Sequence, residues 1–127
     1  MVKKQQQSKA KKLLIEYRPT MLRKTAFESL SEAGNKVFQA CTEQILFTQR
    51  LVERLREDRL LGEKFYWIIY ISYMTNRQPG SVDEILSDIA EKHERIPRRT
   101  YFRLRGRAIK ILDKYLEETP KRMSAEH

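Results

Sequence analysis

The chain has 127 residues, of which 40% are hydrophobic and 34% charged, so it can form one compact core but not two independent ones. Four glycines and four prolines are too few for the turns of an all-β protein, and we therefore expect an all-α fold. The single Cys41 excludes an internal disulfide and a cysteine-based zinc cluster. No run reaches the roughly 18 apolar residues of a membrane span, and we predict a cytoplasmic protein that does not bind membranes.

The net charge of +9 is concentrated in two short segments. Residues 1–12 carry five lysines and no acidic residue, and residues 98–114 carry seven basic residues against the single Asp113. Clustered positive charge favours a polyanionic partner. The chain has no glycine-rich phosphate loop, no Cys–His or Ser–His pairing and no clustered metal ligands, so we expect neither an enzyme nor a cofactor.

In the N-terminal half, the polar, lysine-rich start predicts a flexible basic arm over residues 1–19, with a short helix over 11–17 that Pro19 interrupts. Amphipathic helices follow over residues 20–58, with Gly34 breaking or bending the first of them. Within them, an apolar stripe advances in alternating steps of three and four residues: Phe38, Cys41, Ile45, Thr48, Val52 and Leu55. This stripe either joins two subunits into a homodimer or packs against residues 63–74 of its own chain.

In the middle of the chain, residues 63–74 are apolar on nearly every side, which predicts a helix that is buried all round. The segment NRQPG at 76–80 ends it. Ser81 and Glu84 then have the spacing of a capping box, in which Ser81 caps a helix that ends near Lys92 and Glu84 accepts from the Ser81 amide.

The last predicted helix begins at Pro97 and ends near Glu118, and it is followed by a flexible tail over 119–127. At 100° per residue, one face is apolar: Tyr101, Leu104, Ala108, Ile111, Leu112 and Tyr115. The basic residues gather on the opposite side. The side chains that we expect to contact DNA are Arg98, Arg99, Thr100, Phe102, Arg103, Arg107, Lys110 and Lys114.

Arginine suits double-stranded DNA because its planar fork can donate two hydrogen bonds to guanine in the major groove, which admits one α-helix. Arginine and lysine at the helix edges neutralise phosphates. The capped helix over 81–92, the short connection and the basic helix together predict a helix-turn-helix region over residues 60–118. The contribution of the lysine-rich arm to DNA binding stays open.

The stretch from Tyr66 to Leu116 resembles the helix-turn-helix of sigma-70 region 4-like proteins, and most closely the ArpU-like phage transcriptional regulators. The segments that carry the resemblance are YWIIYISY at 66–73, Asp88–Lys92, Ile96, Arg98–Leu104, Ala108–Ile109 and Leu112. In that family the Arg-Arg-Thr-Tyr segment, here residues 98–101, opens the recognition helix. The resemblance implies a sequence-specific transcriptional regulator of phage or prophage origin. RNA polymerase is a second candidate partner, as an acidic protein on which the basic helix could dock.

Two other functions share the same electrostatics. One is a phage DNA-packaging protein similar to a small terminase subunit, or an RNA-binding protein. The other is a protein-interaction module whose basic helix docks on an acidic partner such as RNA polymerase. Higher oligomers or a preference for RNA would favour the first of these over a DNA-reading regulator.

Overall fold

The computed structural model describes residues 7–28 and 32–126, the backbone alone for 32–34 and 119–126, and every regular element in this part of the chain is helical. The predicted all-α fold is therefore confirmed. The elements in chain order are α1 (Lys9–Ala26), α2 (Glu32–Glu53) with a 3₁₀ turn η1 (Arg54–Glu57), α3 (Gly62–Ile69) with a π-helical turn η2 (Tyr70–Met74), α4 (Val82–Lys92) and α5 (Arg98–Glu126).

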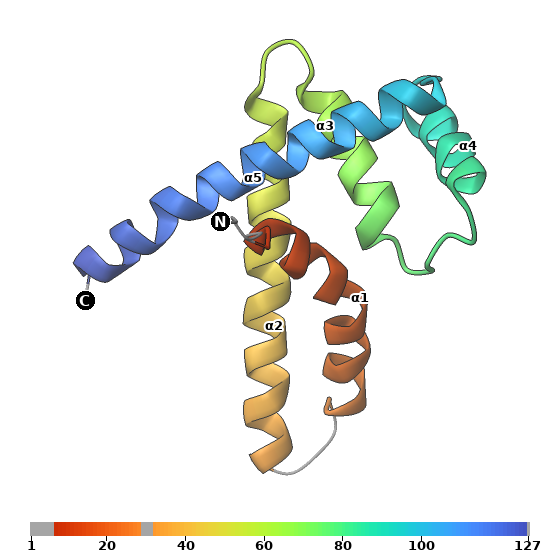
Figure 1. Ribbon diagram of the computed structural model, residues 1–127. Helices are drawn as coiled ribbons and strands as arrows, with labels where there is room; N and C mark the ends of the chain where they lie inside the picture. Colours follow the sequence, from red (N-terminus) through yellow and green to blue (C-terminus); the bar gives the residue numbers. More distant parts are fainter. Residues whose placement is uncertain (1–6, 29–31, 127) are drawn as a thin grey trace, which may run out of the picture.

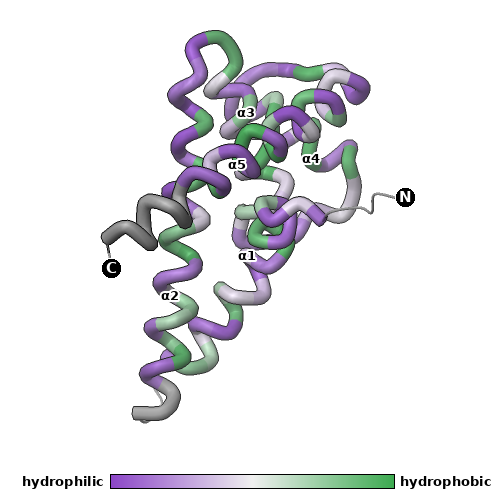
Figure 2. The backbone as a smooth tube through the Cα atoms, turned by 60° about the vertical axis from the view of Figure 1, so that its left-hand side comes forward, coloured by the Kyte–Doolittle hydropathy of each residue, from purple (hydrophilic) through white to green (hydrophobic). Residues whose placement is uncertain are grey.

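The helices share one core. Helices α1 and α2 run alongside each other, α5 crosses both α2 and α3, and α4 lies beside the start of α5 (Figure 1). Side chains from all five helices meet in this core, among them Leu14, Val52, Phe65, Ile89 and Tyr101, all at most 1% exposed. Hydrophilic and hydrophobic stretches alternate along α2, as expected for an amphipathic helix (Figure 2). No helix in the described ranges combines the length and the apolar character needed to cross a membrane.

Helix α1 corrects the prediction for the N-terminus. The short helix predicted over 11–17 lies within α1, which is longer at both ends. The flexible arm predicted over 1–19 is wrong for residues 9–19, which belong to this helix, and residues 1–6 lie outside the described part. Pro19 does not end the helix, although an internal proline costs about 3 kcal/mol. The burial of Leu14, Tyr17 and Thr20 on the face turned to the core offsets this cost, and the ring of Pro19 is exposed.

The apolar stripe of α2 packs inside its own chain. Cys41, Ile45, Thr48, Val52 and Leu55 are buried, and Gly34 does not interrupt the helix. Helix α1 covers most of this stripe, and α3 contacts its end. The structure thus has most of this seam covered within one chain, and homodimerisation stays a prediction.

The segment 63–74 forms α3 and η2, but the prediction that it is buried all round is wrong. One side is fully buried in the core, whereas Tyr66, Trp67 and Tyr70 are half-exposed and pack on one another, with ring centroids 5.2 to 5.8 Å apart. The C-terminal tail also differs from its prediction. Helix α5 continues to Glu126, so residues 119–126, which were predicted to be flexible, are helical.

Candidate nucleic-acid interface

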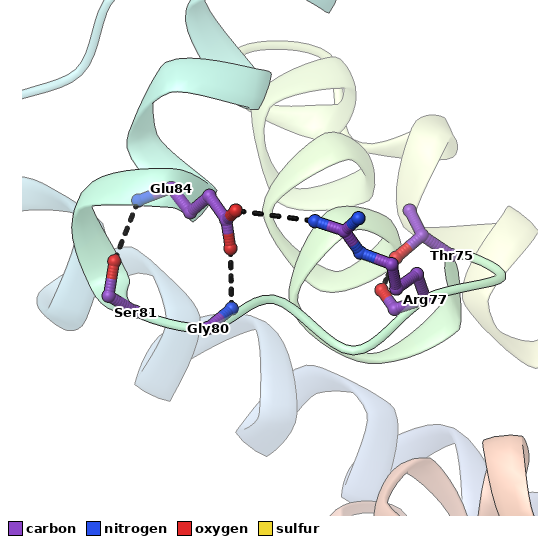
Figure 3. Close-up of polar contacts among 5 residues, drawn as sticks. All are labelled: Thr75, Arg77, Gly80, Ser81 and Glu84. Carbon is purple, nitrogen blue, oxygen red and sulfur yellow. Dashed lines mark hydrogen bonds and ion pairs between the residues drawn. The ribbon is translucent and has the colours of Figure 1, made fainter.

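Helix α4 begins with a side-chain cap. The Ser81 hydroxyl accepts the backbone N–H of Glu84 at 3.2 Å, which confirms the predicted N-cap (Figure 3). The Glu84 carboxylate, however, accepts the N–H of Gly80 and not that of Ser81, and it also pairs with Arg77 at 3.4 Å. Glu84 thus binds the backbone of the preceding loop at Gly80, one residue before the Ser81 amide that the capping box predicts.

Residues 93–97 connect α4 to α5. The N–H of His93 donates to the Ile89 carbonyl at 2.8 Å and ends α4, and Ile96 is buried in the core. Pro97 directly precedes α5 and its carbonyl accepts the N–H of Tyr101 at 2.9 Å. Helix α5 therefore begins at Arg98, one residue after the predicted start.

The rotation of α5 about its own axis is fixed by its inner face. Tyr101, Leu104, Ala108 and Leu112 are at most 3% exposed, as the apolar spacing predicts. The Tyr101 hydroxyl lies 2.7 Å from the hydroxyl of Ser72 in η2, so this buried phenol has a hydrogen-bond partner. Because α5 is anchored on this side, its opposite face must point outward.

That outward face carries five exposed cations, which we call the cation row: Arg99, Arg103, Arg107, Lys110 and Lys114. Their spacing keeps them on one side of the helix from residue 99 to residue 114, a length of about 22 Å. Among the side chains that the structure describes, none of the five is within ion-pair distance of an acidic group. Arg107 lies near the Phe65 ring, with 5.8 Å between the guanidinium and the ring centroid.

The other predicted contact residues lie outside the cation row. Arg98 pairs with Asp83 of α4 at 2.9 Å, so this guanidinium ties the starts of α4 and α5 together. Thr100 is half-buried. Phe102 is 40% exposed at the border of the outer face, packed on the Tyr101 ring at a centroid distance of 5.1 Å and flanked by the guanidinium of Arg105 at 5.2 Å.

Asp113 has a role that the sequence pattern did not reveal. Its carboxylate accepts the Ser8 hydroxyl at 2.8 Å and the backbone N–H of Ala10 at 2.9 Å, so the start of α1 is attached to α5. The only available signal was that Asp113 is the single acid in a basic segment. No spacing rule connects it to residues more than 100 positions away.

Within the described residues, no three His, Cys, Asp or Glu side chains are grouped so that they could hold a metal ion. In comparisons with known proteins, the chain matches no family model, no curated protein and no solved structure. The resemblance of Tyr66–Leu116 to sigma-70 region 4-like proteins therefore stays a prediction.

Proposed function

We propose that this chain is a sequence-specific, DNA-binding transcriptional regulator, in which α4 and α5 act as a helix-turn-helix and α5 enters the major groove. The observation that carries the proposal is the cation row, whose five side chains are exposed on one face of a helix that is fully buried on the other. Charged side chains are usually solvated individually or paired. A row of cations without acidic ion-pair partners in the described structure is suited to an external polyanion.

The dimensions of α5 agree with this role. An α-helix with its side chains is about 10–12 Å across, and the major groove is about 12 Å wide. Helix-turn-helix proteins read bases with the N-terminal part of the second helix. In this arrangement Arg99 and Arg103 donate hydrogen bonds to base edges, and the remaining members of the cation row bind phosphates.

The regulatory role and a phage or prophage origin are parts of the proposal that depend on the resemblance alone. RNA polymerase is a candidate second partner, because a basic helix can dock on an acidic protein surface. The short connection between α4 and α5, closed by the buried Ile96 and by the Arg98–Asp83 pair, supports the helix-turn-helix interpretation.

The test is a selection from a random duplex library with the purified full chain, followed by titrations at several salt concentrations. We expect one enriched sequence and a logarithm of affinity that falls linearly with the logarithm of salt, with the cation row contributing about −3 to −5 to the slope. A duplex with shuffled sequence and an RNA hairpin of equal length are the controls. Equal affinity for all three would indicate a general polyanion binder, and a flat salt dependence would exclude phosphate binding by the cation row.

A further inference from the structure

The start of α1 is held against α5 by one carboxylate. Ser8 caps α1 by accepting the N–H of Lys11 at 3.0 Å, and its hydroxyl donates to Asp113 Oδ2 at 2.8 Å. The other oxygen, Oδ1, accepts the N–H of Ala10 at 2.9 Å. A carboxylate at a helix N-terminus is favoured both by these bonds and by the helix dipole. The contact therefore fixes the first turn of α1 in place.

This contact brings together the two segments that hold the excess positive charge. Lys9, Lys11 and Lys12 are exposed in the first turn of α1, while Ala10 between them is fully buried. On α5, Asp113 lies three residues after Lys110 and directly before Lys114, on the edge of the cation row. Figure 1 shows the start of α1 (red) beside the middle of α5 (blue).

We propose that Lys9, Lys11 and Lys12 form a second phosphate-binding patch for the same DNA, and that Asp113 is the residue that positions this patch. The inference rests on the proposed function. If α5 enters the groove by its N-terminal end, the end of the cation row near Lys114 lies about 22 Å away, beyond a groove that is about 12 Å wide. Lysines placed beside that end then meet the sugar–phosphate backbone that flanks the groove.

Removal of Asp113 should change DNA affinity in the direction opposite to that expected from net charge. Removing an acid from a helix that faces DNA ordinarily strengthens binding, because one repulsion with phosphate disappears. Both oxygens of Asp113 are instead engaged by α1. Its removal should release the lysine patch and weaken binding, although the net charge of the protein rises.

The matched pair of variants is Asp113→Ala and Glu117→Ala, since each removes one negative charge and Glu117 is an exposed residue one turn further along α5. We expect Asp113→Ala to weaken duplex binding by about 10-fold at 100 mM salt, and Glu117→Ala to leave it equal or tighter. Equal tightening by both variants would overturn the positioning role. If Asp113→Ala is unfolded at the assay temperature, Ser8→Ala replaces it, with weaker binding supporting the proposal and unchanged binding overturning it.

The lysine patch itself is tested by the triple variant Lys9→Gln, Lys11→Gln, Lys12→Gln. The salt slope should become shallower by about two to three, because each phosphate contact contributes about 0.9. Adding Asp113→Ala to the triple variant should cause no further weakening, because the patch is already absent. A triple variant with an unchanged slope overturns this inference while the proposed function stands, whereas a wild-type chain that binds no duplex removes the proposed function itself.

Discussion

Arg56 and Arg103 are both exposed arginines at the surface of this protein, but their surroundings differ. Arg56 pairs with Glu53 at 2.7 Å and with Glu63 at 3.1 Å, and its guanidinium lies 3.7 Å from the centroid of the Tyr66 ring. Arg103 has no acidic partner in the described part of the chain. Arg56 therefore joins η1 to α3, whereas Arg103 is available to a ligand.

Arg18, like Arg56, bonds to other parts of the same chain. Its guanidinium donates to the carbonyl and to the hydroxyl of Thr75 at 2.8 and 2.9 Å, and burial lowers the pKa of Arg18 below its ordinary value. It ties α1 to the loop that follows η2. Net charge alone thus does not locate the interface, because some cations hold the fold together and others do not.

The largest effect is expected for DNA affinity when cations without an acidic partner are replaced. Arg99→Ala and Arg103→Ala should each weaken binding to the selected DNA site by about 1–3 kcal/mol, because under the proposed function each removes a fork that contacts a base. The free energy of unfolding should change by less than about 0.5 kcal/mol, because neither side chain has a partner in the described structure. Fluorescence anisotropy with a labelled duplex and thermal unfolding measure the two quantities.

Arg103→Lys is the control for charge. It keeps the positive charge and loses the planar fork, so sequence preference should relax while the salt slope stays the same. If both alanine variants keep full selectivity, the base-reading face lies elsewhere in the protein.

The next largest effect is expected for the stability of the protein when Arg56, which has ion-pair partners, is replaced. Arg56→Ala should lower the free energy of unfolding by about 1 kcal/mol, because it removes two partly exposed ion pairs and a contact with an aromatic ring. Arg59→Ala is the matched control, since Arg59 is exposed nearby and has no ion pair among the described residues. Denaturant unfolding should show a difference between the two variants, with equal selectivity for DNA. Equal stability of both would mean that the Arg56 contacts do not stabilise the fold.

The smallest effect is a pH dependence. Burial raises the pKa of Tyr73 above the ordinary 10.0, although the nearby Arg105 opposes the shift. Because the folded-state pKa exceeds the unfolded one, the full stability is present below pH 10.0 and is lost as pH rises through the folded-state value. Denaturation midpoints between pH 8 and 11 should fall less for Tyr73→Phe than for the natural chain. Identical curves would contradict the shift.

The sequence predicted what depends on neighbouring residues. The two faces of α5 follow from spacing alone, because Tyr101, Leu104 and Ala108 recur with the helical period and the arginines fall between them. The Ser81 cap was found in the same way. Five of the eight predicted contact residues form the cation row, and Arg98, Thr100 and Phe102 lie beside it.

The errors arose where distant parts of the chain decide the local structure. Pro19 predicts a break, but packing of α1 against α2 and α5 keeps the helix continuous. The α2 stripe has the spacing of a dimer seam, and only the position of α1 shows that it is already covered. The contact of Asp113 with Ser8 joins opposite ends of the chain, and no local pattern encodes it.

The partly buried hydroxyl pair of Ser72 and Tyr101 helps to hold α5 in one rotational position. A shift of α5 by one residue in its packing would turn its surface through about 100° and carry the cation row to another side of the molecule. The direction in which the cation row points is thus set from inside the protein. Under the proposed function, substitutions in η2 should therefore change the preferred DNA sequence without altering any side chain of the cation row.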